Sequence, residues 1–225
     1  ALEHSIVEGV HHEEISSLFM EKLNNEFDGA LSLAISIFNN EYHKKFLHQL
    51  VSSQLDMDRL DYLQRDSFFS GVVEGEVSSE RIIKMLTVVN DELAVEAKGI
   101  YSIENFLIAR RLMYWQVYLH KAVLSAEFLL MKILKRAKEI AKSGGELFCT
   151  PILKAFTYNN YTIADFKSKD ILEEFAKLDD YDILAAIKVW VDHDDYILRT
   201  LSSNLVDRNL YKIKLSDKKH APEVV

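Results

Sequence analysis

One segment of the sequence brings acidic, basic and phenolic side chains together at helical spacing. Residues 52–67 read Ser-Ser-Gln-Leu-Asp-Met-Asp-Arg-Leu-Asp-Tyr-Leu-Gln-Arg-Asp-Ser. On a helix, six polar residues of this segment share one face and two leucines lie on the far side. The polar residues are Asp58, Arg59, Asp61, Tyr62, Arg65 and Asp66. The face is either a solvated surface with ion pairs such as Asp61–Arg65, or a polar cleft in which one carboxylate binds a metal and the rest hold an anionic substrate.

A second segment, residues 110–121, combines basic and aromatic side chains. Its helical stripe carries Arg110, Tyr114, Tyr118 and Lys121. Arginine and lysine can neutralise phosphate oxygens, and a tyrosine ring can pack on a sugar or a base. The alternative is an aromatic core helix whose basic side chains reach out to water. A third segment, His11–Glu14, is a weaker signal, because adjacent side chains on a helix diverge and chelate one metal poorly.

Helices are the elements that must position these side chains. Only 7 glycines and 2 prolines occur among 225 residues, which argues against a sandwich, a barrel or a glycine-rich nucleotide fold. Apolar spacing and caps predict helices at 3–25, 30–38, 42–50, 54–69, 79–86 and 102–142, the last with a bend or a break near 120–125. Further helices are predicted at 151–157, from about 163, at 180–191 and at 194–206. The sequence therefore predicts a mainly α protein.

Capping and turn signals refine these boundaries. Capping boxes are predicted at residues 53–56 and 162–165. A small β-hairpin is predicted over 87–97 around Asn90-Asp91, and a short strand over 209–215. The tail from 216 is expected to be disordered, and Ser143-Gly144-Gly145 is the predicted linker between domains 1–142 and 146–225.

Charge and cysteine content limit the partners and the compartment. With 27 Lys and Arg against 35 Asp and Glu, the net charge of −8 disfavours nucleic acid. The longest apolar run, Ala30–Phe38, is too short to span a membrane. No signal peptide is visible and Cys149 is the single cysteine, so a cytoplasmic location is expected.

Three runs together resemble the HD-domain deoxynucleoside triphosphate triphosphohydrolases: residues 52–66, residues 110–121, and Arg208-Asn209-Leu210-Tyr211-Lys212. The resemblance extends from about Val10 to Leu215. It implies an HD-domain-like helical bundle with a C-terminal helical appendage, hydrolysis of dNTPs to deoxynucleoside and triphosphate, and a homo-oligomer. It also implies a divalent metal ion, without deciding among Mn, Mg, Fe, Ni and Zn.

The resemblance also implies roles for individual residues. Asp58 matches a metal ligand, Arg59 and Tyr62 match contacts to the phosphates and sugar, and Asp66 matches the residue that holds the sugar 3′-hydroxyl. Arg110 matches a phosphate-binding arginine, Tyr118 a tyrosine that packs on the sugar and base, and Lys121 is expected at the triphosphate tail. His12 and Glu13 match a catalytic pair near the α-phosphate, whereas Leu119 leaves the base preference open.

The sequence departs from the family in its metal ligands. The histidine and the His-Asp pair that precede such a segment in the family are absent. His193-Asp194 has no upstream partner histidine at a plausible spacing and is not expected to replace them. Residues 1–225 alone are therefore expected to be inactive. Two other functions remain open: an HD phosphohydrolase acting on another nucleotide or phosphoester, and a non-catalytic nucleotide-binding module.

Overall fold

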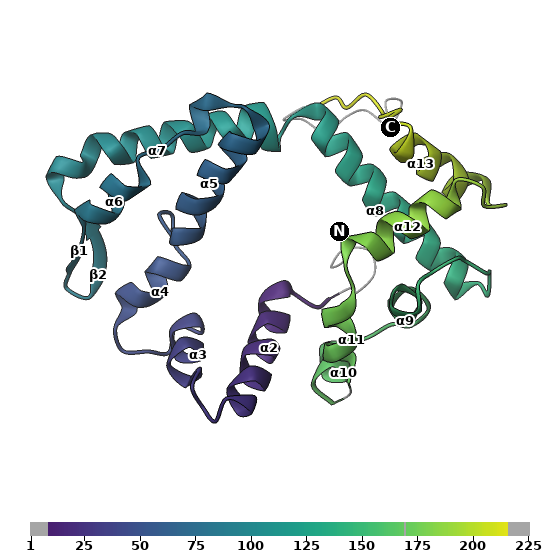
Figure 1. The fold of residues 1–225 in the computed structure, drawn as a ribbon, viewed down its shortest axis with the longest axis horizontal. Coiled ribbons are helices and arrows are strands. Elements are labelled where there is room, and N and C mark those ends of the chain that lie inside the picture. The colour runs from purple at the N-terminus through teal and green to yellow at the C-terminus, as the bar shows by residue number, and fades with distance from the viewer. Residues whose placement is uncertain (1–8, 169, 216–225) are drawn as a thin grey trace. The chain divides into compact units, whose positions relative to one another are not determined.

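The computed structural model describes residues 9–168 and 170–215 (Figure 1). The chain forms two compact units. One contains residues 19–120, and the other contains the residues up to 18 together with those from 121 onward. Within the described ranges the structure is mainly α with a single two-stranded hairpin, which confirms the predicted fold class.

Helix α2 (His12–Glu26) begins in one unit and ends in the other. It begins at His12, and the predicted helix is absent from residues 9–11, where Gly9 has a left-handed backbone with φ +79°. The predicted residues 3–8 lie outside the described part of the chain. The further elements of the 19–120 unit are α3 (Ser32–Phe38), α4 (Lys45–Val51), α5 (Met57–Ser70), η1 (Val73–Gly75), α6 (Ser79–Met85), β1 (Leu86–Val89), β2 (Glu92–Val95), η2 (Ala97–Gly99), α7 (Ile100–Met113) and the π-helical turn η3 (Tyr114–Tyr118).

Helix α5 forms because its sequence supplies a cap, a stop and an apolar stripe. Asp56 is the N-cap, and its side chain accepts a hydrogen bond from the Arg59 amide. The helix ends where Gly71 adopts φ +72°. The predicted capping box with Ser53 as N-cap is therefore wrong, since the acidic residue itself caps a helix that begins at Met57.

Helix α5 packs against α7 and η1 through one apolar core. The buried residues of this core are Leu60, Leu63, Val77, Ile82, Phe106, Ala109 and Met113. Tyr62 and Tyr118 pack at its margin and are only partly buried. The core thus fixes the two helices whose polar faces carry the predicted site residues.

The hairpin matches its prediction. Asn90 and Asp91 both have positive φ, at 53° and 64°, as a two-residue turn of this hand requires. Strand β1 pairs antiparallel with β2, with Val88 opposite Leu93. Helix α4 covers β2, where the Gln49 side chain accepts a hydrogen bond from the Leu93 amide at 2.6 Å.

The second unit is built around α8 (Lys121–Lys142), which packs against α9 (Pro151–Tyr158) and α13 (Tyr196–Val206). Its other helices are α10 (Ile163–Ser168), α11 (Ile171–Lys177) and α12 (Asp180–Trp190). Because α8 and α9 lie in one compact unit, the predicted linker at 143–145 joins two packed helices. The division into domains at that linker stays a prediction.

The predicted strand at 209–215 is wrong. These residues are neither strand nor helix, and the Tyr211 carbonyl accepts a hydrogen bond from the Ser125 hydroxyl of α8 at 2.8 Å. A strand needs a neighbouring strand, and the described residues of this unit contain none.

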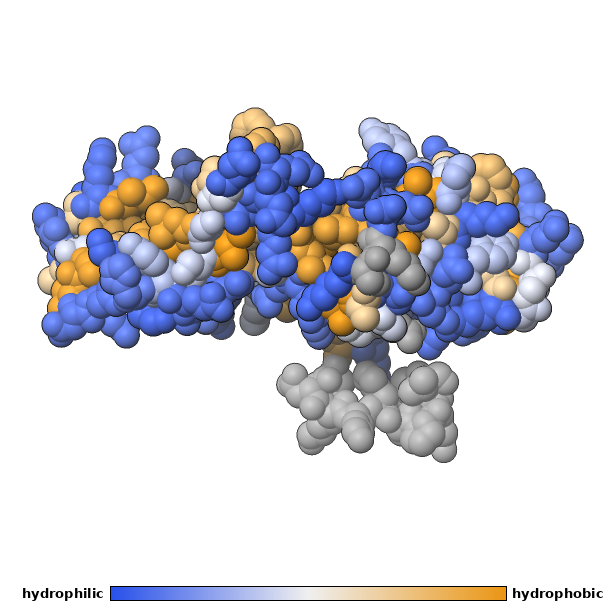
Figure 2. Space-filling model, turned by 90° about the horizontal axis from the view of Figure 1, so that it is seen from below, coloured by the Kyte–Doolittle hydropathy of each residue, from blue (hydrophilic) through white to orange (hydrophobic). Residues whose placement is uncertain are grey.

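Large apolar side chains reach the surface among hydrophilic ones (Figure 2). The most exposed are Phe69 at 82%, Tyr181 at 81%, and Phe68 and Tyr101 at 80%. Within the described ranges, none of the helices combines the length and the apolar character needed to cross a membrane.

Candidate functional site

The first part of the site is the start of α5, where Asp56 holds Arg59. The Arg59 Nε–H lies 2.9 Å from Asp56 Oδ2 and 2.9 Å from the Ser53 carbonyl oxygen. Burial lowers the pKa of Arg59, but the hydrogen bond and charge of Asp56, with smaller effects from Tyr62, raise it above its ordinary value. Arg59 is thereby a fixed cation next to the Tyr62 phenol.

A short hydrogen bond joins α5 to the π-helical turn. The Tyr118 hydroxyl donates to Asp66 Oδ2 at 2.6 Å, and the Tyr118 ring meets the Tyr62 ring edge to face at 6.1 Å. Burial, followed by the hydrogen bond and the charge of Asp66, raises the pKa of Tyr118 well above its ordinary value. Tyr118 therefore remains a donor, and the second carboxylate oxygen of Asp66 can accept from a ligand hydroxyl.

The π-helical turn itself changes the geometry that a regular helix would give. The Leu119 amide donates to the Tyr114 carbonyl at 2.7 Å, five residues back, which marks the π hydrogen bond. The long predicted helix over 102–142 is thus interrupted here, and α8 starts at Lys121. Such turns occur frequently at functional sites.

Arg110, in the last turn of α7, lies against the aromatic side chains of η3. Its guanidinium carbon lies 5.8 Å from the centre of the Tyr114 ring, which in turn meets the Tyr118 ring edge to face at 5.2 Å. The Arg110 Nη1 donates to the side-chain oxygen of Gln54 at 3.0 Å. Sequence reasoning does not identify Gln54 as a site residue. Its position inside the 52–66 run was the one available signal.

Two acidic side chains of α5, Asp58 and Asp61, are exposed to solvent. Arg65 forms the predicted ion pair with Asp61, at 2.7 Å. The hydrogen bond from Arg65 to Asp61, and then the charge of Asp61, raise the pKa of Arg65, with smaller effects from the charges of Asp66 and Asp58. The solvated-face interpretation thus holds for this pair, while Asp66 faces the aromatic side chains.

The structure brings together five of the predicted residues and leaves four outside this group. Arg59, Tyr62, Asp66, Arg110 and Tyr118 form what we call the α5–η3 cluster, joined by Gln54 and Tyr114. His12, Glu13 and Lys121 belong to the other compact unit, so their place at the site stays a prediction. Asp58 lies on α5 but is exposed, and its role as a metal ligand also stays a prediction.

The described residues do not fit a metal ion by themselves. Across residues 9–168 and 170–215, no three His, Cys, Asp or Glu side chains are grouped closely enough to hold a metal. Asp58 offers one carboxylate. The ring nitrogens of His193 lie 3.1 Å from the Glu146 carbonyl and 3.0 Å from the Asp195 amide, so this histidine is occupied by backbone groups, in line with the interpretation that it does not bind metal.

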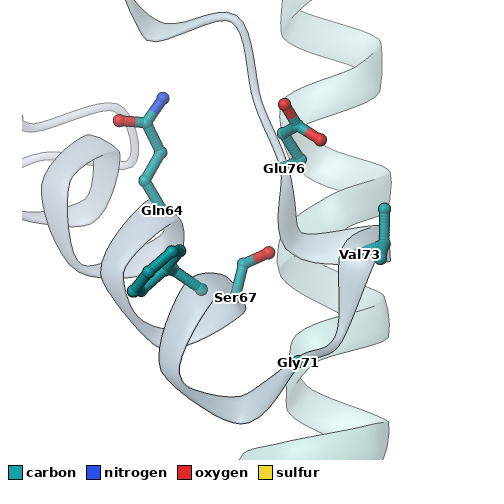
Figure 3. Close-up of a pocket in the computed structure, with 6 residues that line it drawn as sticks. Gln64, Ser67, Gly71, Val73 and Glu76 are labelled. Atoms are coloured by element: carbon teal, nitrogen blue, oxygen red, sulfur yellow. The ribbon is translucent and has the colours of Figure 1, made fainter.

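A separate cavity of about 440 Å³ lies on α5 and the segment after it (Figure 3). It is lined by Gln64, Ser67, Phe68, Gly71, Val73 and Glu76. Two polar side chains of this lining form hydrogen bonds to the backbone: Gln64 donates to the Val77 carbonyl, and Ser67 donates to the Val72 carbonyl. None of the predicted site residues lines it.

The sequence and the fold of this chain are similar to those of known proteins. Residues 77–146, which run from before α6 into the segment between α8 and α9, match the family described as HD associated region. A crystal structure of a phosphohydrolase from Bacteroides thetaiotaomicron is 56% identical, with a TM-score of 0.94 over 99% of this chain and 56% of that chain.

The chain is also similar to two curated relatives. The uncharacterized protein YwfO of Bacillus subtilis is 37% identical over 76% of this chain and 38% of that protein. The deoxynucleoside triphosphate triphosphohydrolase SAMHD1 homolog of Dictyostelium discoideum is 23% identical over 90% of this chain and 37% of that protein. The chain spans roughly two fifths of the length of each. Together the matches support an HD-domain phosphohydrolase family, whereas the narrower resemblance to dNTP triphosphohydrolases stays a prediction.

Proposed function

We propose that the protein carrying this chain hydrolyses deoxynucleoside triphosphates to a deoxynucleoside and triphosphate. The observation that carries the proposal is the Tyr118–Asp66 hydrogen bond, which leaves the carboxylate a spare acceptor oxygen. The Tyr118 ring contacts the Tyr62 and Tyr114 rings, and these lie next to Arg59 and Arg110 respectively. A deoxynucleotide presents complementary groups, namely a sugar hydroxyl, a flat base and a chain of phosphates.

Each part of the α5–η3 cluster matches one part of such a substrate. Asp66 accepts a hydrogen bond from the sugar hydroxyl, and Tyr118 packs on the sugar and base. Arg59 and Arg110 bind phosphate oxygens, for which the planar guanidinium is well suited, and Tyr62 contacts the sugar and phosphates. Burial lowers the pKa of Arg59, but Asp56 raises it above its ordinary value, so this guanidinium stays a cation at physiological pH.

The remaining assignments are part of the same proposal. His12 and Glu13 act near the α-phosphate, Lys121 binds the phosphate tail, and Asp58 gives one carboxylate to a divalent metal ion. HD-domain phosphohydrolases generally use divalent metal ions, and the other ligands in this proposal are not among the described residues. We also propose that the protein acts as a homo-oligomer.

Product analysis tests the proposal. The full-length protein is incubated with each dNTP and each of several divalent metals, and the products are separated by ion-exchange chromatography. Wild type is expected to release triphosphate, whereas Asp66→Asn is expected to lose most of this activity because the amide is a poorer acceptor for the sugar hydroxyl. Glu104→Gln, an exposed carboxylate on α7, is the matched control. Release of pyrophosphate or single phosphates instead of triphosphate would contradict the proposal.

A further inference from the structure

Arg110 is held from two sides before any ligand arrives. Gln54, in the segment before α5, accepts a hydrogen bond from Arg110 Nη1 at 3.0 Å. The centre of the Tyr114 ring lies 5.8 Å from the guanidinium carbon of Arg110. Gln54 and Arg110 are 56 residues apart in sequence but belong to the same compact unit. The contact therefore depends on how α5 and α7 pack.

The partner of Arg110 differs in charge from the partners of the two other arginines nearby. Arg59 pairs with the Asp56 carboxylate at 2.9 Å, and Arg65 pairs with the Asp61 carboxylate at 2.7 Å. Gln54 is neutral, so it orients a guanidinium without neutralising it. Arg110 is consequently the arginine of this group that keeps most of its charge for an anion.

The hydrogen bond with Arg110 also fixes the orientation of the Gln54 side-chain amide. Its oxygen accepts from Arg110, which leaves the NH₂ group of the same amide as a donor. Gln54 and Arg110 together therefore present N–H groups to their surroundings. An anionic ligand satisfies both the donors and the positive charge of such a pair, a neutral acceptor satisfies only the donors, and a cationic ligand satisfies neither.

We infer that Gln54 is a positioning residue that holds Arg110 ready to bind a phosphate group of the substrate. This inference rests on the proposed function, since it assumes that Arg110 binds phosphate. An arginine side chain has many rotamers, and fixing it in advance removes part of the entropy loss that would otherwise accompany binding. Gln54 acts through Arg110 and is not itself required for the chemical step.

The experiment measures dissociation constants of the full-length protein for each dNTP, for the matching deoxynucleoside and for inorganic triphosphate. The variants are Gln54→Ala, Arg110→Ala and the double variant. Gln64→Ala is the matched control, because Gln64 is also a glutamine of the α5 segment but bonds only to the Val77 carbonyl among the contacts described. Circular dichroism verifies that every variant is folded.

Gln54→Ala is expected to weaken dNTP and triphosphate binding by about threefold to tenfold, the usual effect of losing one hydrogen bond to a charged group at a partly exposed position. Binding of the deoxynucleoside is expected to stay unchanged. In the Arg110→Ala background the Gln54 substitution is expected to have no further effect, which is the sign of a shared role. Gln54→Glu, which adds a negative charge beside Arg110, is expected to weaken triphosphate binding at least as strongly as alanine does.

The outcomes separate the inference from the proposed function. If Arg110→Ala leaves dNTP and triphosphate binding unchanged, the proposed function fails and the inference fails with it. If Arg110→Ala weakens binding but Gln54→Ala does not, the inference alone is overturned. An equal loss of dNTP and deoxynucleoside affinity in Gln54→Ala would also overturn it, since that pattern reports a general structural effect.

Discussion

The hydroxyl of Tyr118 donates to the carboxylate of Asp66 at 2.6 Å, between two residues that are 52 positions apart in the sequence. This hydrogen bond links α5 to the π-helical turn at the margin of the apolar core that α5 and α7 share. It sets the distance between a helix that carries the acidic and basic side chains and a turn that carries the aromatic ones. The α5–η3 cluster exists because these two elements meet here.

Replacing Tyr118 with phenylalanine removes the donor while it keeps the ring. We expect the free energy of unfolding to fall by about 0.5–1.5 kcal/mol, the usual net value of one such hydrogen bond, since Asp66 is half-buried. Urea unfolding of wild type and Tyr118→Phe measures the difference. Deoxynucleotide affinity is expected to fall as well, because Asp66 loses the group that orients it.

A matched tyrosine gives the control for this prediction. Tyr101, on α7, is 80% exposed, so Tyr101→Phe is expected to leave both unfolding and binding unchanged. If Tyr118→Phe behaves like Tyr101→Phe in both measurements, the hydrogen bond has no role in the cluster.

Gly75 is predicted to tolerate no side chain. A Cβ atom at this position would come within 2.5 Å of the Met113 sulfur and within 2.8 Å of the Ser67 Cβ. Both neighbours are buried, so Gly75→Ala is expected to destabilise the protein by about 1–3 kcal/mol through overpacking. Denaturant unfolding is the measurement, and Gly75→Ala together with Met113→Ala is expected to lose less than the sum of the two single changes. Strict additivity would show that the two residues do not collide.

Asp195 is predicted to give the protein an acid-sensitive ion pair. Hydrogen bonds from Arg136, at 2.6 Å and 3.1 Å, lower the pKa of Asp195 to about 2, against a smaller opposing effect of burial. Because the unfolded chain binds this proton more readily, the pair stabilises the folded state fully above pH of about 4 and loses its effect as the pH falls toward 2.

Comparing variants over this pH range isolates the ion pair from the helix cap. Asp195 is the N-cap of α13, and asparagine caps helices about as well as aspartate does. Asp195→Asn is therefore expected to be less stable than wild type at pH 7, and the difference between the two proteins is expected to shrink between pH 4 and pH 2. A difference that is constant across this range would contradict the prediction.

Asp56 is predicted to stabilise α5 both as a cap and as the partner of Arg59. It is 5% exposed and accepts hydrogen bonds from the Arg59 amide and side chain. Asp56→Ala is expected to cost at least about 1–2 kcal/mol, the upper part of the range for N-caps, with Asp56→Asn intermediate. Thermal unfolding of the three proteins checks this order, and equal stability of Asp56→Ala and wild type would refute it.

Much of the fold could be predicted from the sequence because its signals are local. The hairpin follows from Asn90-Asp91, and the apolar face of α5 follows from the spacing of Leu60 and Leu63. One failure arose where a distant contact decides the local structure. The segment at 209–215 alternates like a strand, but its Tyr211 carbonyl bonds to Ser125 on α8.

The structure groups several side chains that the sequence analysis named, while their roles at a site stay predictions. The resemblance named Arg59, Tyr62, Asp66, Arg110 and Tyr118, and the structure brings these together. Spacing on a regular helix could not give the π-helical turn. Gln54 was missed because its contact with Arg110 joins segments 56 residues apart, and its place inside the 52–66 run was the only signal for it.

The central claim is that the α5–η3 cluster binds a deoxynucleoside triphosphate through its phosphates and its sugar. Titration calorimetry of the full-length protein with a non-hydrolysable dNTP analogue tests it most directly, in wild type, Asp66→Asn, Arg110→Ala and Glu104→Gln. We predict that the first two substitutions each weaken binding about tenfold or more, as loss of a hydrogen bond involving a charged group does, and that Glu104→Gln binds like wild type. Wild-type affinity in both Asp66→Asn and Arg110→Ala would contradict the account.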